Sequence, residues 1–238
     1  LAGGFAGAAT FAVPHTAAAQ LRVAPATSPP SPITVEARQI SSFSKIGGGN
    51  RIGQLEFRGG LILTSSNSDF GGFSYLVIEA DGRRILAVSD EGHWLSAEID
   101  YAGAAPTGLS KVMIAPLLAS SGKELSRKRD ADAESMALLD GKLTNGTVLM
   151  GWGRNHRSDG CVIVEGGLQP PAGYLKPPAD AKRMKTNKGF EALAILRGGA
   201  NNGAVIAFSE RFPDPALTHS GWIWIKGEPL RIQLKDIG

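Results

Sequence analysis

The chain is patterned as short apolar runs separated by turns rich in glycine and asparagine. In the clearest pair, residues 187–195 and 204–211 flank a Gly/Asn-rich turn. Short apolar runs bounded by turn residues predict β-strands rather than helices. Each run has a carboxylate at a fixed place, because Glu191 stands where the first begins and Glu210 where the second ends. We therefore expect a hairpin with two acids at the same end.

Weaker copies of this pair occur twice upstream. The first comprises residues 70–78 and 85–92 around Asp81-Gly82, and the second comprises residues 129–138 and 147–154 around Asp140-Gly141. Superposing the three copies aligns Ser74, Glu134 and Glu191 at one position, and Asp90, Gly153 and Glu210 at another. If the copies form equivalent hairpins, their acids stack at one end of the molecule.

The repeat decides the expected fold. A period of about 60 residues, with roughly four short strands per unit, is typical of a β-propeller blade with long loops. Because a hairpin cannot bury its apolar face alone, such units pack against their neighbours around an axis. We predict an all-β fold, specifically a β-propeller, with a β-sandwich as the alternative that needs no repeat. Three copies are too few to close a ring comfortably, so we expect the propeller in this chain to be incomplete at its C-terminal end.

Composition agrees with a β-rich globular protein. Of 238 residues, 42% are hydrophobic and 20% charged, and the 31 glycines and 14 prolines favour many turns over long helices. Residues 33–38, 54–58 and 60–64 have the pattern of further short strands. The net charge of +3 is spread over mixed surface charges, which excludes a nucleic-acid footprint. We expect a monomer with no nucleic-acid partner.

The first residues have the composition of an export signal. Residues 1–20 contain no Lys, Arg, Asp or Glu and end in a small-residue cleavage pattern, which predicts a signal peptide over residues 1–19. Pro14, His15 and the short apolar run argue against a membrane anchor. Residues 20–32 form a Pro/Ala-rich linker, and residues 33–238 the folded domain. We expect a periplasmic or secreted protein that is free of the membrane after signal removal, and the missing basic leader leaves the Sec and twin-arginine routes open.

Three common catalytic arrangements, a reactive thiol, a zinc site and a serine nucleophile, are disfavoured by the sequence. The single cysteine, Cys161, lies beside Val162 and Ile163 and is predicted to be a buried strand residue. The four histidines have no zinc-binding spacing. A Gly-x-Ser-x-Gly nucleophile elbow is also missing from the sequence, and Ser74 is a poor substitute for one.

Several segments resemble a known family. They are Gly71-Gly72-Phe73-Ser74, Ser89-Asp90-Glu91-Gly92, residues 130–137, Arg154-Asn155-His156-Arg157 and Gly189-Phe190-Glu191-Ala192-Leu193-Ala194. Their order and spacing resemble the bacterial phytase-like family, whose domain is called "esterase-like activity of phytase", from about Phe57 to the end of the chain. The resemblance implies an exported β-propeller that continues beyond this chain. Two departures are Ser135, where the family has a small Gly, and Gly153, where the family has a carboxylate.

The ends of the innermost propeller strands converge on a central channel, so their polar residues can form one site. Carboxylates held close together repel one another, and a hard cation with several oxygen ligands relieves that repulsion. We therefore expect a Ca²⁺ site, and its candidate ligands are Asp90, Glu134, Glu191 and Glu210. The candidate catalytic residues are Glu134, Glu191 and His156, and the candidate substrate-binding residues are Arg154, Asn155, Arg157, Lys188 and Arg211.

Two functions fit this arrangement. The first is a metal-assisted hydrolase of small-molecule phosphate or carboxylate esters, in which the metal polarises the ester and activates a water. The second is a non-catalytic propeller that binds a ligand or a protein partner in its central funnel. In that case Glu134, Glu191 and Glu210 tie loops through hydrogen bonds and ion pairs, and the loss of the acid at Gly153 favours this alternative.

Overall fold

The computed structural model describes residues 28–42, 50–125, 127–153, 158–164, 166–185, 188–212 and 219–234. Within these ranges the regular structure is β apart from a four-residue helix, α1 (Lys128–Ala131), and a 3-10 turn, η1 (Ala181–Arg183). The all-β class predicted from the sequence is confirmed. Among the described residues, no helix is long and apolar enough to span a bilayer.

Three antiparallel sheets carry most of the chain. The first has the order β1-β9-β8-β7-β6, and the others follow sequence order, β10-β11-β12-β13 and β14-β15-β16-β17. The strands of the first sheet are β1 (Ser31–Pro32), β6 (Phe73–Ile78), β7 (Arg84–Ser89), β8 (His93–Ala102) and β9 (Ala105–Pro116). Those of the second are β10 (Ala133–Asp140), β11 (Thr147–Trp152), β12 (Ser158–Val164) and β13 (Gly167–Tyr174). Those of the third are β14 (Phe190–Ile195), β15 (Val205–Ser209), β16 (His219–Ile225) and β17 (Glu228–Leu234).

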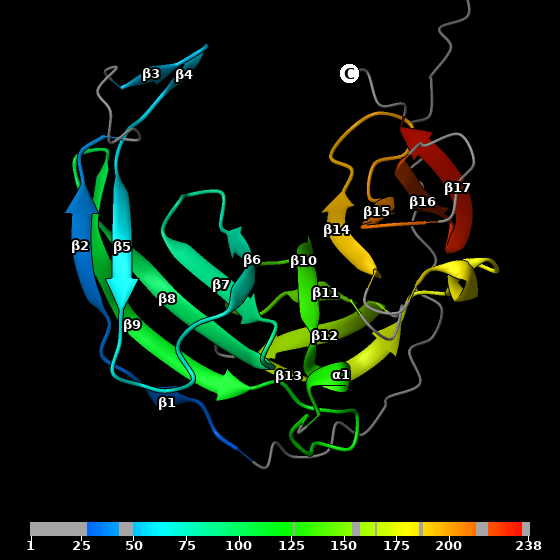
Figure 1. Cartoon of the computed structure of the whole chain (residues 1–238), viewed down its shortest axis with the longest axis horizontal. Helices are drawn as coiled ribbons and strands as arrows, with labels where there is room; N and C mark the ends of the chain where they lie inside the picture. The colour runs from blue at the N-terminus through cyan, green and yellow to red at the C-terminus, as the bar shows by residue number, and fades with distance from the viewer. Residues whose placement is uncertain are drawn as a thin grey trace, which may run out of the picture.

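Two small two-stranded ribbons lie between β1 and β6 along the chain. In one, β2 (Glu36–Ile40) pairs with β5 (Gly60–Thr64), and in the other, β3 (Arg51–Ile52) pairs with β4 (Leu55–Glu56). The β2–β5 ribbon packs beside β9. The three large sheets follow one another along an arc, with β6, β10 and β14 on its inner side and β9, β13 and β17 on its outer side (Figure 1). The innermost strand of each sheet therefore presents a free edge to the concave side.

Successive sheets pack face to face because side chains alternate along each strand. On β10, Met136 and Leu138 belong to a core cluster shared with the first sheet, whereas Ala137 and Leu139 belong to a cluster shared with the third. A third cluster covers the other face of the first sheet, where Ile33 packs among its side chains. The second sheet is thus covered on both faces.

The predicted repeat is present in the strand registers. The first strand of every hairpin has an irregularity at the same place, between Phe73 and Tyr75, between Ala133 and Ser135, and between Phe190 and Ala192. Ser74, Glu134 and Glu191 are the residues left out of the ladder at these bulges. The alignment made from the sequence is therefore correct.

Three strand boundaries differ from the sequence prediction. The segment 129–138 begins as helix α1 and turns into β10 only at Ala133, because the N–H groups of Asp130 and Ala131 close a helical turn on Arg127 O. The strand expected at 33–38 is shifted to Glu36–Ile40, because Ile33 N donates to Val112 O and its side chain packs against the first sheet. The strand expected at 54–58 is only two residues long.

One prediction on a single residue is confirmed. Cys161 is 1% exposed and free, and it lies in the core between the first and second sheets. Trp222 and Trp224 alternate on β16 and are both buried between the second and third sheets. The predicted signal peptide, residues 1–19, lies outside the described residues, while the last two residues of the predicted linker form β1 and pair with β9.

Candidate functional site

The bulges bring three polar side chains together at the start of the inner strands. The Ser74 side chain hydrogen-bonds to Glu134, and the Glu134 and Glu191 carboxylates lie close enough to interact electrostatically. A bulge inserts one residue into a strand and re-aims its side chain. The same irregularity in three neighbouring sheets therefore directs Ser74, Glu134 and Glu191 to one region, as the sequence alignment predicted.

The second aligned position also forms a structural series. The N–H of Asp90 donates to Gly72 O at 2.9 Å, that of Gly153 to Asp132 O at 3.0 Å, and that of Glu210 to Gly189 O at 3.1 Å. These bonds join two facing positions in each hairpin. In every sheet one position is an acid and the other is glycine: Gly72 and Asp90, Asp132 and Gly153, Gly189 and Glu210. The second sheet has not lost its acid, because Asp132 supplies it from the opposite strand.

Close packing explains why each facing pair has a single side chain. A Cβ on Gly72, whose φ is +59°, would lie 2.6 Å from Asp90 Oδ1. A Cβ on Gly153 would lie 3.0 Å from Asp132 Oδ2 and 3.0 Å from Glu134 Cγ. Real Cβ atoms rarely approach other atoms so closely. Sequence alignment compared single positions and so missed Asp132 as the replacement for the acid at Gly153, although it stands where the other copies have glycine.

The resulting carboxylate cluster comprises Asp90, Asp132, Glu134, Glu191 and Glu210. Two lysines enter it from the connecting segments. Lys128 of α1 pairs with Asp90 and, at 3.3 Å, with Asp132, and so joins the first sheet to the second. Lys188, which precedes β14, pairs with Glu210. Partial burial opposes the charge of Lys128, but its hydrogen bonds to Asp90 and Asp132 outweigh this effect and raise its pKa.

Glu191 has the most strongly shifted pKa in the cluster. Burial, reinforced by the charges of Glu134 and Glu210, raises the pKa of Glu191 to about 7, while Lys188 opposes this rise. Burial and the charge of Asp132 also raise the pKa of Glu134, against the hydrogen bond from Ser74. A carboxyl group that titrates near neutral pH is suited to general acid–base chemistry.

Of the other predicted site residues, Arg211 alone lies in the described part of the chain. Arg211 follows Glu210 and is exposed. Arg154, Asn155, His156 and Arg157 lie outside the described residues, so their predicted roles in binding and catalysis stay predictions.

The described part of the chain contains no group of three or more His, Cys, Asp or Glu side chains arranged to hold a metal ion. Ammonium groups already pair with three carboxylates of the cluster, those of Asp90, Asp132 and Glu210. As placed, these side chains do not form a ready cage for Ca²⁺. The calcium site at Asp90, Glu134, Glu191 and Glu210 stays a prediction.

A groove lies along the inner strands, beyond the bulges. It has a volume of about 290 Å³ and is lined by residues 75–78 of β6, 136–138 of β10 and 193–195 of β14, together with Arg197. Tyr75 donates to Leu193 O at 3.5 Å across this space. Its lining as described contains none of the clustered carboxylates.

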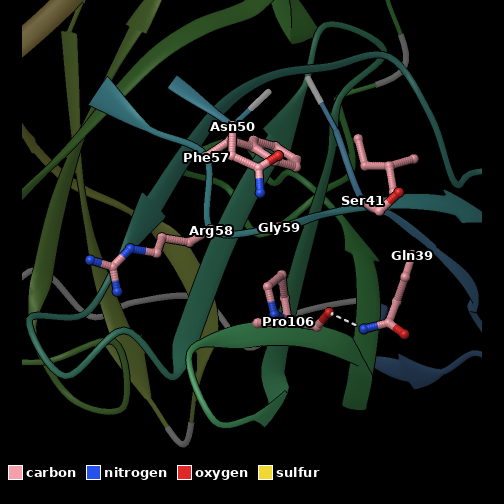
Figure 2. Close-up of a pocket in the computed structure, with 9 residues that line it drawn as sticks. Gln39, Ser41, Asn50, Phe57, Arg58, Gly59 and Pro106 are labelled. Carbon is pink, nitrogen blue, oxygen red and sulfur yellow. Dashed lines mark hydrogen bonds between the residues drawn. The ribbon is translucent and has the colours of Figure 1, made fainter. Parts of the chain in front are cut away.

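A second hollow lies beside the two N-terminal ribbons (Figure 2). Its volume is about 240 Å³, and Gln39 Nε2 donates to Pro106 O at 2.9 Å along its wall. The one charged side chain among its lining residues, Arg58, pairs with Glu56 at 3.2 Å. This hollow brings together fewer reactive groups than the carboxylate cluster does.

The protein is an all-β protein built from three repeated antiparallel sheets. Its candidate site is the acidic cluster formed where the inner hairpins of these sheets meet. A family model described as "Phytase-like: Esterase-like activity of phytase" matches residues 68–236, which is more than half of the chain. The chain belongs to this phytase-like family. No curated protein matches it.

Proposed function

We propose that this protein is an exported β-propeller ester hydrolase in which Glu191 is the catalytic acid–base group. Membership of the phytase-like family supports a hydrolase of phosphate or carboxylate esters. The observation that carries the proposal is the position of Glu191, whose pKa is raised to about 7 by burial and by neighbouring carboxylates. Export is proposed from the uncharged, small-residue N-terminal segment.

The propeller is proposed from how the sheets cover one another. In the first and second sheets, the face that points along the arc is buried by the next sheet. The same face of the third sheet has no cover among the described residues: Ala192 and Ala194 are exposed on β14, and Leu230 and Leu234 are each 53% exposed on β17. Because isolated blades leave apolar faces in water, we propose that a further sheet of the same kind packs there.

In the proposed reaction, the Glu191 carboxylate takes a proton from a water molecule, and the water oxygen attacks the ester carbon or phosphorus. The proton then passes from Glu191 to the departing alkoxide, which leaves as an alcohol and restores the carboxylate. Lys188 lies close enough to Glu191 to lower its pKa, and its ammonium group is the candidate to stabilise negative charge on the attacked group.

The direct test is hydrolysis of p-nitrophenyl acetate and p-nitrophenyl phosphate by the wild-type protein and by Glu191→Gln. We expect a loss of about 10²–10⁴-fold in kcat/KM, because the amide cannot exchange the proton. Glu228→Gln is the matched control, since Glu228 is an exposed glutamate on the outermost strand that pairs with Lys176. Turnover that is absent from the wild-type protein, or unchanged in Glu191→Gln, contradicts the proposal.

The second candidate is a non-catalytic protein whose acids are structural. It is favoured by the ion pairs of Lys128 and Lys188, which tie the ends of the sheets together. This candidate predicts that Glu191→Gln lowers the melting temperature and that no ester is turned over. The hydrolase proposal predicts the opposite results in both measurements.

A further inference from the structure

We propose that the end face of the third sheet, the face turned away from the second sheet, is a dimer interface on which the same face of a second copy of this chain packs. This inference rests on the further sheet proposed above and identifies it as the third sheet of the partner. It replaces the monomer expected from the sequence with a two-fold symmetric dimer. Because it concerns assembly, ester hydrolysis can succeed or fail independently of it.

The end face is apolar across all four strands. Its apolar side chains, read from the strand registers, are Ala192, Ala194, Ile206, Phe208, Ile223, Ile225, Leu230, Ile232 and Leu234. None of them is buried, and Leu230 and Leu234 are each 53% exposed. On the opposite face of the sheet, Phe190, Trp222 and Trp224 are 4% exposed or less. A contiguous apolar surface of this kind marks a site of interaction.

The size and shape of the end face suit a weak dimer. Four strands about 4.8 Å apart, with about five residues each at roughly 3.4 Å per residue, give a footprint of about 300 Å². Two such footprints make a contact at the small end of specific interfaces, below about 1,200 Å² in total. A Cβ on Gly221 would lie 2.5 Å from Phe208 Cδ1, so the glycine makes room for the ring to lie over the sheet. The polar residues of the face, His219 and Glu228, stand at strand ends, where the rim of an interface stays in water. We therefore expect a dimer that dissociates on dilution.

The other end of the arc is largely covered, which points to a second copy as the partner. On the first sheet, the face turned away from the second sheet contains Ile85 and Leu95, which are 6% and 3% exposed. Ile33 and Phe70 pack against this face and cap that end of the arc. Repeated units that stack in a row need a cap at each end. The third sheet has no cap among the described residues, and the surface that matches it in width and apolar character is the same face of another copy.

The test is sedimentation equilibrium of the full chain over a range of micromolar concentrations. The mass of the wild-type protein should rise from that of a monomer toward that of a dimer. Leu230→Lys should weaken dimerisation by about 100-fold, because the two-fold axis places the new charge in the interface twice. Ala194→Glu, on the innermost strand of the same face, should have the same effect. A circular dichroism melt of each variant checks that it is folded.

Ile78→Lys is the matched control. Ile78 is 46% exposed, and its pairing with Ile85 places it on the face of the first sheet that is turned away from the second. In a symmetric dimer this face takes no part, so Ile78→Lys should associate as the wild-type protein does. Equal weakening by Ile78→Lys and Leu230→Lys would mean that the third sheet of one copy packs on the first sheet of the next. That head-to-tail contact would overturn the symmetric dimer.

The remaining outcomes separate this inference from the proposed function. A wild-type protein that is monomeric at every concentration overturns the inference and leaves ester hydrolysis standing. Association that neither Leu230→Lys nor Ala194→Glu weakens also overturns it, because the copies then meet elsewhere. If the protein dimerises as expected but turns over no ester, the interface is supported and the hydrolase proposal alone fails.

Discussion

The second and third sheets each place one carboxylate at the acidic end of the hairpin, but on opposite strands. In the third sheet the acid is Glu210, at the end of β15, and the facing residue is Gly189; in the second sheet the acid is Asp132, before β10, and the facing residue is Gly153. Each hairpin has room for one side chain at this place. The difference shows that the repeat preserves a carboxylate per sheet rather than a residue type per position.

The two glycines differ in what surrounds them. A Cβ on Gly189 would meet the backbone oxygens of Trp152 and Gly153 in the neighbouring sheet, whereas a Cβ on Gly153 would meet the side chains of Asp132 and Glu134. Backbone atoms of a packed sheet cannot yield, but side chains can rotate. The position of the acid is therefore constrained in the third sheet and adjustable in the second.

The largest expected effect is that of Gly189→Asp, which copies the arrangement of the second sheet into the third. We expect the free energy of unfolding to fall by about 3–5 kcal/mol, because the new side chain forces the second and third sheets apart. Urea denaturation followed by tryptophan fluorescence measures this change, since Trp222 and Trp224 lie at that interface. A loss below 1 kcal/mol would show that the two sheets separate freely.

Gly153→Asp should be milder, with a loss of about 1–2 kcal/mol from crowding and like-charge repulsion against Asp132. Adding Asp132→Gly removes the repulsion and the crowding by Asp132, leaves only the contact with Glu134, and moves the acid to the strand that carries it in the third sheet. The double variant should therefore recover most of the lost stability. If the losses in free energy of unfolding caused by Gly153→Asp and Asp132→Gly simply add in the double variant, the acid cannot be moved from one facing position to the other.

Glu191→Gln should stabilise the protein at alkaline pH. The raised pKa of Glu191 means that the folded state holds its proton more tightly than the unfolded state, so stability falls as pH rises from 4.5 through about 7. Removing the charge should raise the melting temperature by about 2–4 °C at pH 8, after a discount for solvent screening, and should change it little at pH 4.5. Calorimetric melts at both pH values measure the shift. A lower melting temperature at pH 8 indicates a structural carboxylate.

The smallest expected effect distinguishes the role of Lys188 from that of Lys128. Lys188 lowers the pKa of Glu191, so Lys188→Met should move the midpoint of the pH–kcat/KM profile upward, by less than the rise that burial causes. Lys128→Met is the control, because Lys128 pairs with Asp90 and Asp132 instead. Equal shifts in both variants would indicate a general charge effect rather than a local one.

Calcium tests the remaining prediction about the cluster. If Asp90, Glu134, Glu191 and Glu210 rearrange around the ion, Ca²⁺ in excess should raise the melting temperature, and a chelator should reverse the effect. Activity that is unchanged by chelation would be consistent with the lysine-paired cluster. Melts with and without Ca²⁺ at pH 8 measure the difference.

The sequence was sufficient for the hairpins and for the convergence of Ser74, Glu134 and Glu191, because apolar periodicity and turn spacing are local signals. It was not sufficient to show that Asp132 replaces the acid at Gly153, or that Lys128 joins the cluster. Their roles depend on which residues face each other across strands and on helix α1 between two sheets, and neither follows from residue spacing.

The central claim is that the three sheets form one electrostatically coupled cluster in which Glu191 titrates near neutral pH. The most direct measurement is a pH titration of the Glu191 side-chain carboxyl carbon by NMR, assigned with Glu191→Gln. We predict a pKa of about 7 in the wild-type protein. We also predict a lower value in Glu134→Gln, because one of the repelling charges is removed. A pKa near the ordinary glutamate value of about 4.3, unaffected by Glu134→Gln, would contradict the account.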